Sequence, residues 1–147
     1  MIVKAEEKHL NDIYLIEKKS FDNPWSENHI KNDLMYLNQS ANWVFLISGK
    51  VVGYIFGLII MDEYHLTNIA VHPDYFRQKI GTKLIKHIIL FLLTKNIKVI
   101  LLEVSSNNIP AIKYYQSMGF ISVGVRKKYY KNGDDAILYN LYLEKHG

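Results

Sequence analysis

The feature that most constrains this chain is a strand-like segment that leads into a basic turn and then into a long amphipathic helix. It spans residues 68–82 and reads NIAVHPDYFRQKIGT. The first turn of a helix carries backbone N–H groups without intrahelical partners and the positive end of the helix dipole. Both favour a bound anion such as a pyrophosphate. Arg77, Lys79 and Lys83 add mobile positive charge. An ordinary loop before an ordinary helix is the alternative, because a single glycine makes the motif weakly specific.

The segment after this turn has the most regular apolar spacing in the chain. Between residues 79 and 95, Ile80, Leu84, Ile88 and Leu92 recur at every fourth position, and lysines lie opposite them. We therefore predict a long helix there. The β-branched and leucine residues of 98–104 predict a buried strand after it.

The rest of the chain alternates strand-like and helix-like patterns. Ser26 is typical of a helix N-cap, and Gly119 is well placed to end a helix. Gly49-Lys50 and Asn132-Gly133 predict tight hairpin turns. The other predicted elements are a strand near residues 2–4, a helix over 9–20, strands over 43–48, 51–61 and 65–71, a helix capped by Asn107 or Asn108, and strands over 120–130 and 134–143. The order is strand, two helices, three strands, helix, strand, helix and two strands, which indicates a mixed α/β (α+β) chain.

Length and composition predict one compact domain over residues 1–147. A hydrophobic fraction of 49% is ordinary for a globular protein, and no repeat or proline-rich linker divides the chain. The net charge of +4 fits anionic partners such as a nucleotide cofactor or a ribonucleoprotein surface. The chain has no cysteine, which excludes a disulfide framework, a thiolate metal site and a cysteine nucleophile. Its first residues lack the order of a signal peptide, and its apolar runs are too short to span a bilayer. We therefore expect a soluble, cytoplasmic protein with no membrane partner.

Glu103 interrupts an apolar strand pattern. It lies between Leu102 and Val104, and the two-residue alternation of a strand places it on the same face as Val99 and Leu101. A carboxylate there is a candidate general base that takes a proton, directly or through water, from an attacking amine. The alternative is a solvated or ion-paired glutamate at the end of the strand.

Tyr115 lies on the helix predicted after that strand, one turn after Ile112. A phenol at the buried end of this helix could donate a proton to a leaving thiolate. Tyr114 points elsewhere, because only one of the two tyrosines can face the strand that carries Glu103. Core packing is the alternative role for Tyr115. The six histidines are scattered without a close ligand pair, so we expect no metal site.

These residues together resemble the GNAT superfamily of acetyl-CoA-dependent N-acetyltransferases, and within it the RimI-type ribosomal-protein alanine N-acetyltransferases. The resemblance covers nearly the whole chain. It rests on NPWSE at 23–27, NIAV at 68–71, Pro73, Tyr75, Arg77, Gln78, Gly81, LEV at 102–104, Asn108, Ala111, Ile112, Tyr115, MGF at 118–120, Arg126, Tyr129, Tyr130 and DDAI at 134–137. It implies a GNAT fold, with a central, mostly antiparallel, twisted mixed sheet of about seven strands flanked by about four helices.

The resemblance also implies roles for the matching positions. Glu103 would be the base that deprotonates the substrate amine, and Tyr115 the acid that protonates coenzyme A as it leaves. Acetyl transfer would be direct, without a covalent enzyme intermediate. The pantetheine arm of acetyl-CoA would bind like an added strand to the backbone of Ile69, Ala70 and Val71, with a hydrogen bond from Asn108. The pyrophosphate would be held by the backbone amides of Arg77, Gln78, Lys79, Ile80, Gly81 and Thr82.

The implied acceptor is the α-amino group of a protein N-terminus, an N-terminal alanine of a small-subunit ribosomal protein. Trp25, Tyr129 and Tyr130 match positions near the acceptor groove, with aromatic packing as the alternative. The basic run of Arg126, Lys127, Lys128 and Lys131 fits a solvated hairpin rim better than a nucleic-acid surface, so direct nucleic-acid binding is not expected. Two other functions stay open, an acetyltransferase for another peptide or small amine and a non-catalytic module that binds acetyl-CoA.

The chain departs from the family pattern in the phosphate turn. Phe76 replaces a glutamine or arginine, and Lys79 replaces the first glycine. A glycine lets the backbone approach a phosphate closely, whereas lysine adds bulk at Cβ together with a charge that could contact the phosphates. We predict that Lys79 adopts an ordinary helical or bridge conformation and supports binding.

Overall fold

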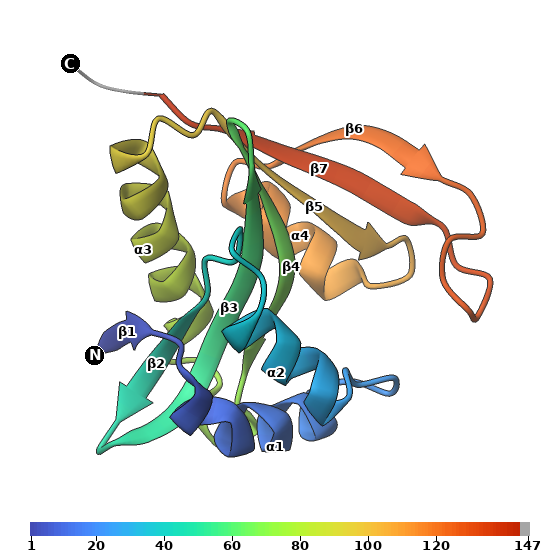
Figure 1. The fold of residues 1–147 in the computed structure, drawn as a ribbon. Helices are drawn as coiled ribbons and strands as arrows, with labels where there is room; N and C mark the ends of the chain where they lie inside the picture. Colours follow the sequence, from blue (N-terminus) through green and yellow to red (C-terminus); the bar gives the residue numbers. More distant parts are fainter. Residues whose placement is uncertain (145–147) are drawn as a thin grey trace.

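The structure is a computed structural model and describes residues 1–144. Its centre is a seven-stranded sheet in the order β1-β2-β3-β4-β5-β7-β6 (Figure 1). The strands are β1 (Ile2–Lys4), β2 (Trp43–Ile47), β3 (Lys50–Ile60), β4 (Glu63–Val71), β5 (Val99–Ser105), β6 (Ile121–Arg126) and β7 (Ala136–Tyr142). The helices are α1 (Leu10–Ser20), α2 (Glu27–Met35), α3 (Ile80–Thr94) and α4 (Ile109–Ser117), with 3-10 turns η1 (Glu7–His9) and η2 (Pro73–Tyr75). β4 and β5 are parallel and all other neighbours are antiparallel, so the predicted fold class is confirmed.

Helices cover both faces of the sheet (Figure 1). On one face, α1 and α2 contribute Ile13, Ile16 and Ile30 to an apolar cluster. On the other, α3 and α4 pack on the sheet through a larger cluster that includes Leu84 and Tyr115. In the part of the chain that the structure describes, no helix is long and apolar enough to cross a membrane.

The predicted helices form for the expected local reasons. The hydroxyl of Ser26 accepts a hydrogen bond from the backbone N–H of His29 at 3.1 Å and so caps α2. Gly119 has φ +97° and ends α4 in a conformation that glycine adopts without steric cost. The stripe along α3 is buried, and each fully buried leucine or isoleucine in it contributes about 1.5–3 kcal/mol. The buried residues are Ile80, Leu84, Ile85, Ile88 and Leu92.

Two hairpin predictions need correction. The turn between β2 and β3 is made by Ser48 and Gly49, both with positive φ, because Ile47 pairs with Lys50. Between β6 and β7 the strands stop early, and residues 127–135 form a longer loop with Asn132-Gly133 at its tip. Here the Asp135 carboxylate accepts a hydrogen bond from the backbone of Lys128 at 2.9 Å. A side chain thus takes a backbone donor that the predicted ladder would have used.

β4 and β5 form a fork. Their ladder has three pairs, Glu63 with Val99, Tyr64 with Ile100 and His65 with Leu101, and within residues 1–144 it continues no further. A register shift in the β3–β4 pairing between Phe56 and Gly57 leaves Thr67 as an extra residue of β4 just beyond this point. The backbone of β4 from Thr67 onward therefore separates from β5 in the middle of the sheet.

Candidate active site

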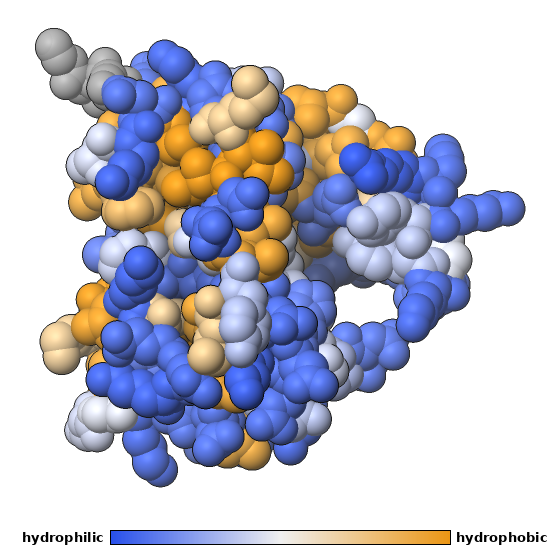
Figure 2. Space-filling model, viewed as in Figure 1, coloured by the Kyte–Doolittle hydropathy of each residue, from blue (hydrophilic) through white to orange (hydrophobic). Residues whose placement is uncertain are grey.

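A cavity of about 590 Å³ opens at the fork. β4 contributes His65 and Thr67 to its wall, and β5 contributes Glu103. The rest of the wall includes Trp25, which precedes α2, and Tyr130, which lies in the loop after β6. Figure 2 shows this side of the molecule hollowed where the segment after β6 arches away from the body. Four segments far apart in sequence thus meet around one space.

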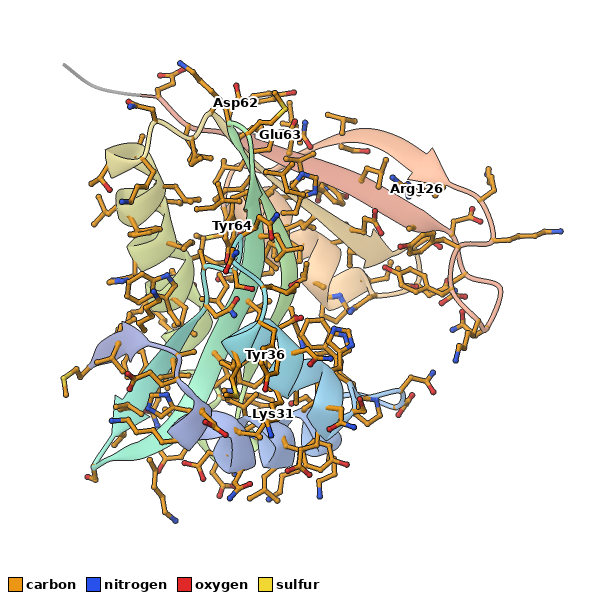
Figure 3. All side chains as sticks on the ribbon, viewed as in Figure 1. Lys31, Tyr36, Asp62, Glu63, Tyr64 and Arg126 are labelled. Atoms are coloured by element: carbon orange, nitrogen blue, oxygen red, sulfur yellow. The ribbon has the colours of Figure 1, made fainter. Side chains whose placement is uncertain are left out.

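Glu103 faces this cavity. Its neighbours Leu102 and Val104 are buried in the α3–α4 cluster, so the alternation of β5 directs Glu103 to the opposite face. The Glu103 side chain is 31% exposed, and its Oε1 lies 3.8 Å from Nε of Arg126, at the end of β6 (Figure 3). The contacts of Glu103 therefore match the alternative of an ion-paired glutamate. The position at the cavity also fits a base that acts on a bound amine.

Two tyrosines after β6 complete the surroundings of Glu103. A hydrogen bond to Glu103, and then the charge of that carboxylate, raise the pKa of Tyr129. Burial, and then the Glu103 charge, raise the pKa of Tyr130. Both phenols stay protonated at neutral pH, and the hydroxyl of Tyr129 donates a hydrogen bond to this carboxylate. Trp25, Tyr129 and Tyr130 thus all line the same cavity as Glu103.

Tyr115 lies on the other side of β5. It is 9% exposed, belongs to the same cluster as Leu102, and contacts Phe120 edge-to-face with 5.5 Å between ring centroids. Burial first, and the neighbouring Tyr114 second, raise the pKa of Tyr115 to about 12. A phenol that holds its proton so firmly is uncharged throughout the physiological range and can act only as a donor of that proton. The core-packing alternative also holds, because the ring is part of the core.

The phosphate turn has an unusual backbone. Arg77 has φ +68°, and Lys79 has φ +59° and ψ +28°, in the left-handed region. The prediction of an ordinary helical or bridge conformation for Lys79 is therefore wrong. A left-handed residue costs roughly 1–2 kcal/mol unless it is glycine, which explains why related turns carry glycine at this position. Across the described residues, no acceptor is bonded to the backbone N–H groups of residues 77–82.

Gly81 faces the gap between the end of β4 and α4. A Cβ built on it would lie 3.9 Å from Cγ2 of Val71 and 3.9 Å from the hydroxyl of Tyr114, which is ordinary contact. The same hydroxyl lies 2.8 Å from Oγ1 of Thr82 and so ties the start of α3 to α4. Asn108 caps α4, since its Oδ1 accepts the N–H of Ala111 at 3.3 Å.

The structure also reveals a buried carboxylate that the sequence reasoning left without a role. Glu17 on α1 is 2% exposed and accepts three hydrogen bonds. They come from the Tyr54 hydroxyl at 2.5 Å, Nδ2 of Asn68 at 2.7 Å and the backbone N–H of Trp25 at 2.8 Å. The sequence feature that indicates this buried acid is its position next to Ile16, on the apolar side of the helix predicted over residues 9–20. Glu17 thereby fixes the cavity wall at Trp25 to β3 and β4.

The remaining charged groups are partly neutralised by neighbours. Nζ of Lys127 lies 3.4 Å from Oδ2 of Asp135, and Arg126 is paired with Glu103, so the basic run after β6 is not a uniform positive surface. Among residues 1–144, no three acidic, histidine or cysteine side chains come together as a metal site.

Known proteins share this fold and sequence. The acetyltransferase (GNAT) family model matches residues 10–120. The chain is 34% identical over 140 residues to [ribosomal protein bS18]-alanine N-acetyltransferase of Escherichia coli K12, with 93% of each chain covered. It is 32% identical over 130 residues to the Bacillus subtilis protein called putative [ribosomal protein bS18]-alanine N-acetyltransferase, with 88% of this chain and 86% of that one covered. The crystal structure of the ribosomal-protein-S18-alanine N-acetyltransferase from Escherichia coli superposes with a TM-score of 0.91 at 33% identity, over 100% of this chain and 96% of that one. The chain therefore belongs to the GNAT acetyltransferase family and is an acetyl-CoA-dependent N-acetyltransferase.

Proposed function

We propose that this enzyme acetylates the α-amino group of a protein N-terminus by direct transfer from acetyl-CoA, with the N-terminal alanine of ribosomal protein bS18 as its acceptor. The observation that carries the proposal is the fork between β4 and β5. The carboxylate of Glu103 lies on its wall, and the buried phenol of Tyr115 belongs to the core cluster that contains Leu102 and Val104, the neighbours of Glu103 on β5. The names of the relatives from Escherichia coli and Bacillus subtilis supply the acceptor.

The residues around the fork fit acetyl-CoA. The backbone of Ile69, Ala70 and Val71 has no ladder partner on the β5 side among the described residues, so it can pair with an amide-containing arm. The free N–H groups of residues 77–82 and the start of α3 suit a pyrophosphate. When bound, acetyl-CoA supplies an activated acetyl group as a thioester. Asn108 is proposed to bind the same arm through its Nδ2, because its Oδ1 serves the cap.

In the proposed mechanism Glu103 takes a proton from the acceptor nitrogen as the N–C bond forms. Tyr115 gives its phenolic proton to sulfur as the C–S bond breaks; its raised pKa means that the phenol carries this proton before the step begins. Placing two reactants together removes much of the entropic barrier, and each proton transfer contributes about 10²–10⁴-fold.

The dimensions of the site favour a peptide over a small amine. A second hollow of about 590 Å³, lined by Asp22, Pro24 and Asp134, shares Tyr130 with the cavity at Glu103. A chain whose amino group reaches Glu103 thus has room for its next residues between the segments before α2 and after β6. A small amine would leave most of this surface unused.

The test is acetyl transfer to a peptide with the N-terminal sequence of bS18, read as peptide mass and as released thiol. A blocked N-terminus should abolish both signals, and replacement of the first alanine should reduce them. Glu103→Gln and Tyr115→Phe should each lower kcat by about 10²-fold or more while acetyl-CoA still binds. Glu7→Gln and Tyr36→Phe, at exposed positions outside the site, should behave like the wild type. Transfer to lysine side chains in place of the α-amine would refute the proposed acceptor.

A further inference from the structure

The chemistry of the proposed reaction requires the acceptor nitrogen to lose two protons. An α-amino group with a pKa of about 8 enters the site mainly as an ammonium ion at neutral pH. It must lose one proton to expose the lone pair that forms the N–C bond, and a second once that bond exists. The sulfur of coenzyme A takes up one proton, so one proton leaves for solvent in each turnover. Glu103 can hold only one proton at a time.

A histidine shares the cavity with Glu103. His65 is the last residue of β4 that pairs with β5, opposite Leu101, and Glu103 lies two residues further along β5 on the same face as Leu101. Glu103 lies beyond the last paired residue, where β4 and β5 separate, so there is room for an amine or a water molecule between the two side chains. Both His65 and Glu103 line the cavity wall. Histidine is the side chain that exchanges protons near neutral pH.

Glu63 connects this histidine to solvent. Its Oε1 lies 3.2 Å from Nε2 of His65, and the two side chains are 41% and 38% exposed. Glu63 is at the outer end of β4, next to the turn that follows β3 (Figure 3). The pair therefore reaches from the cavity at the fork to the surface of the molecule. A carboxylate beside an imidazole orients the ring and stabilises its protonated form.

We propose that His65, supported by Glu63, is a second proton acceptor of this active site. It takes the first proton from the acceptor ammonium ion, directly or through one water molecule, and releases it to solvent. Glu103 is then free to take the second proton as the N–C bond forms, and Tyr115 protonates the sulfur. Glu103 afterwards gives up its proton and Tyr115 regains one by exchange with solvent, so the net release is the one proton that His65 passes on. The inference rests on the proposed function to the extent that the acceptor is a primary amine.

The charges around His65 are compatible with this role. Glu63 faces it from the same strand, and Glu103 faces the same cavity from β5. From the β6 side, Arg126 is the one Lys or Arg on the wall within residues 1–144, and it is paired with Glu103; Tyr129 and Tyr130 are neutral there. On β3, the residue opposite His65 is Leu58. Two carboxylates, Glu63 and Glu103, therefore share these surroundings with the imidazole, and the guanidinium of Arg126 is paired with Glu103.

The test is the pH dependence of kcat/KM for the peptide in His65→Ala and the wild type. Near pH 7 the acceptor is an ammonium ion, and we expect the variant to be slower by about tenfold. This is less than the usual range of about 10²–10⁴-fold for a lost acid–base group because solvent can substitute in part. Near pH 9 the acceptor is already a free amine that has one proton left to lose, so the two curves should converge. Free imidazole should restore the variant near pH 7. The matched control is His72→Ala, which removes another histidine beside a carboxylate, Asp74 at 3.8 Å, outside the cavity wall.

Three results would overturn the inference. They are equal activity of the variant and the wild type at every pH, a loss of the same size near pH 7 and pH 9, and a loss that imidazole does not reverse. The second would mean that His65 shapes the cavity without moving a proton. The assay uses whichever primary amine the wild type acetylates, since every ammonium ion loses two protons in this reaction. Failure of the α-amine proposal therefore appears in the wild type, and failure of the His65 proposal in the comparison of variants.

Discussion

Gly81→Ala should stabilise the folded protein and weaken acetyl-CoA binding. Gly81 has no positive φ, and a Cβ there meets nothing closer than 3.9 Å, so alanine fits the fold. Alanine in a helix is better than glycine by roughly 0.5–1 kcal/mol, and we expect about half of that this close to the start of α3. The new methyl group would point between Val71 and Tyr114, into the path proposed for the pantetheine arm. A methyl group forced into a fitted contact costs about 1–3 kcal/mol, which corresponds to roughly tenfold to hundredfold weaker binding.

Two measurements on one protein sample decide this prediction. Urea unfolding without ligand gives the stability change, and calorimetric titration with acetyl-CoA gives the affinity. Gly133→Ala is the control, since Gly133 has φ +91° in the loop after β6, where alanine is strained, and should lose stability without loss of affinity. If Gly81→Ala binds acetyl-CoA as tightly as the wild type, the cofactor does not pass between β4 and α4 at this point.

Three further predictions follow from the backbone, the buried carboxylate and the buried phenol. Lys79→Gly should raise the free energy of unfolding by about 0.5–1 kcal/mol, because relief of a left-handed side chain exceeds the entropic cost of glycine; a fall in urea midpoint would contradict the observed φ. Glu17→Ala should lower stability by about 3 kcal/mol, because its three donors lose their acceptor, and a thermal-shift assay in which Tm stays unchanged would rule out that network. Tyr115 ionises near 10 when unfolded and near 12 when folded, so its stabilising effect is complete below about pH 10 and falls by at most about 1.4 kcal/mol per pH unit as the pH rises towards 12. Denaturant titrations at pH 9 and about 11 should therefore show a steeper loss for the wild type than for Tyr115→Phe, and equal slopes would contradict the raised pKa.

The order of elements could be predicted because it depends on local patterns. Three such predictions are confirmed, and each depends on a few neighbouring residues. They are the apolar residue at every fourth position of α3, the Ser26 cap of α2 and the end of α4 at Gly119. The positions of Trp25 and Glu103 at one cavity followed from the family resemblance. These features could be predicted because the local preferences of the sequence are consistent with the overall fold.

The parts that could not be predicted depend on contacts between distant segments or on the path of the backbone. Lys79 takes a left-handed conformation because the turn between η2 and α3 requires it there, against the preference of the side chain. The loop after β6 is shaped by the side chains of Asp134 and Asp135, which bond to residues up to 29 positions away. The position of His65 and Glu103 on one cavity wall follows from the register of β4 and β5, which the sequence does not encode locally.

The short ladder between β4 and β5 divides the sheet into two leaves. β1 to β4 form one leaf and β5, β7 and β6 the other, and the backbone joins them through three residue pairs. Away from these pairs, the Thr82–Tyr114 hydrogen bond joins the helices α3 and α4, which follow β4 and β5 in the chain. A ligand bound in the fork would contact both leaves, so its binding would also raise the free energy of unfolding of the whole domain. Amide hydrogens on both sides of the fork should then exchange more slowly together, and the energy of cofactor binding becomes part of the resistance of this protein to unfolding.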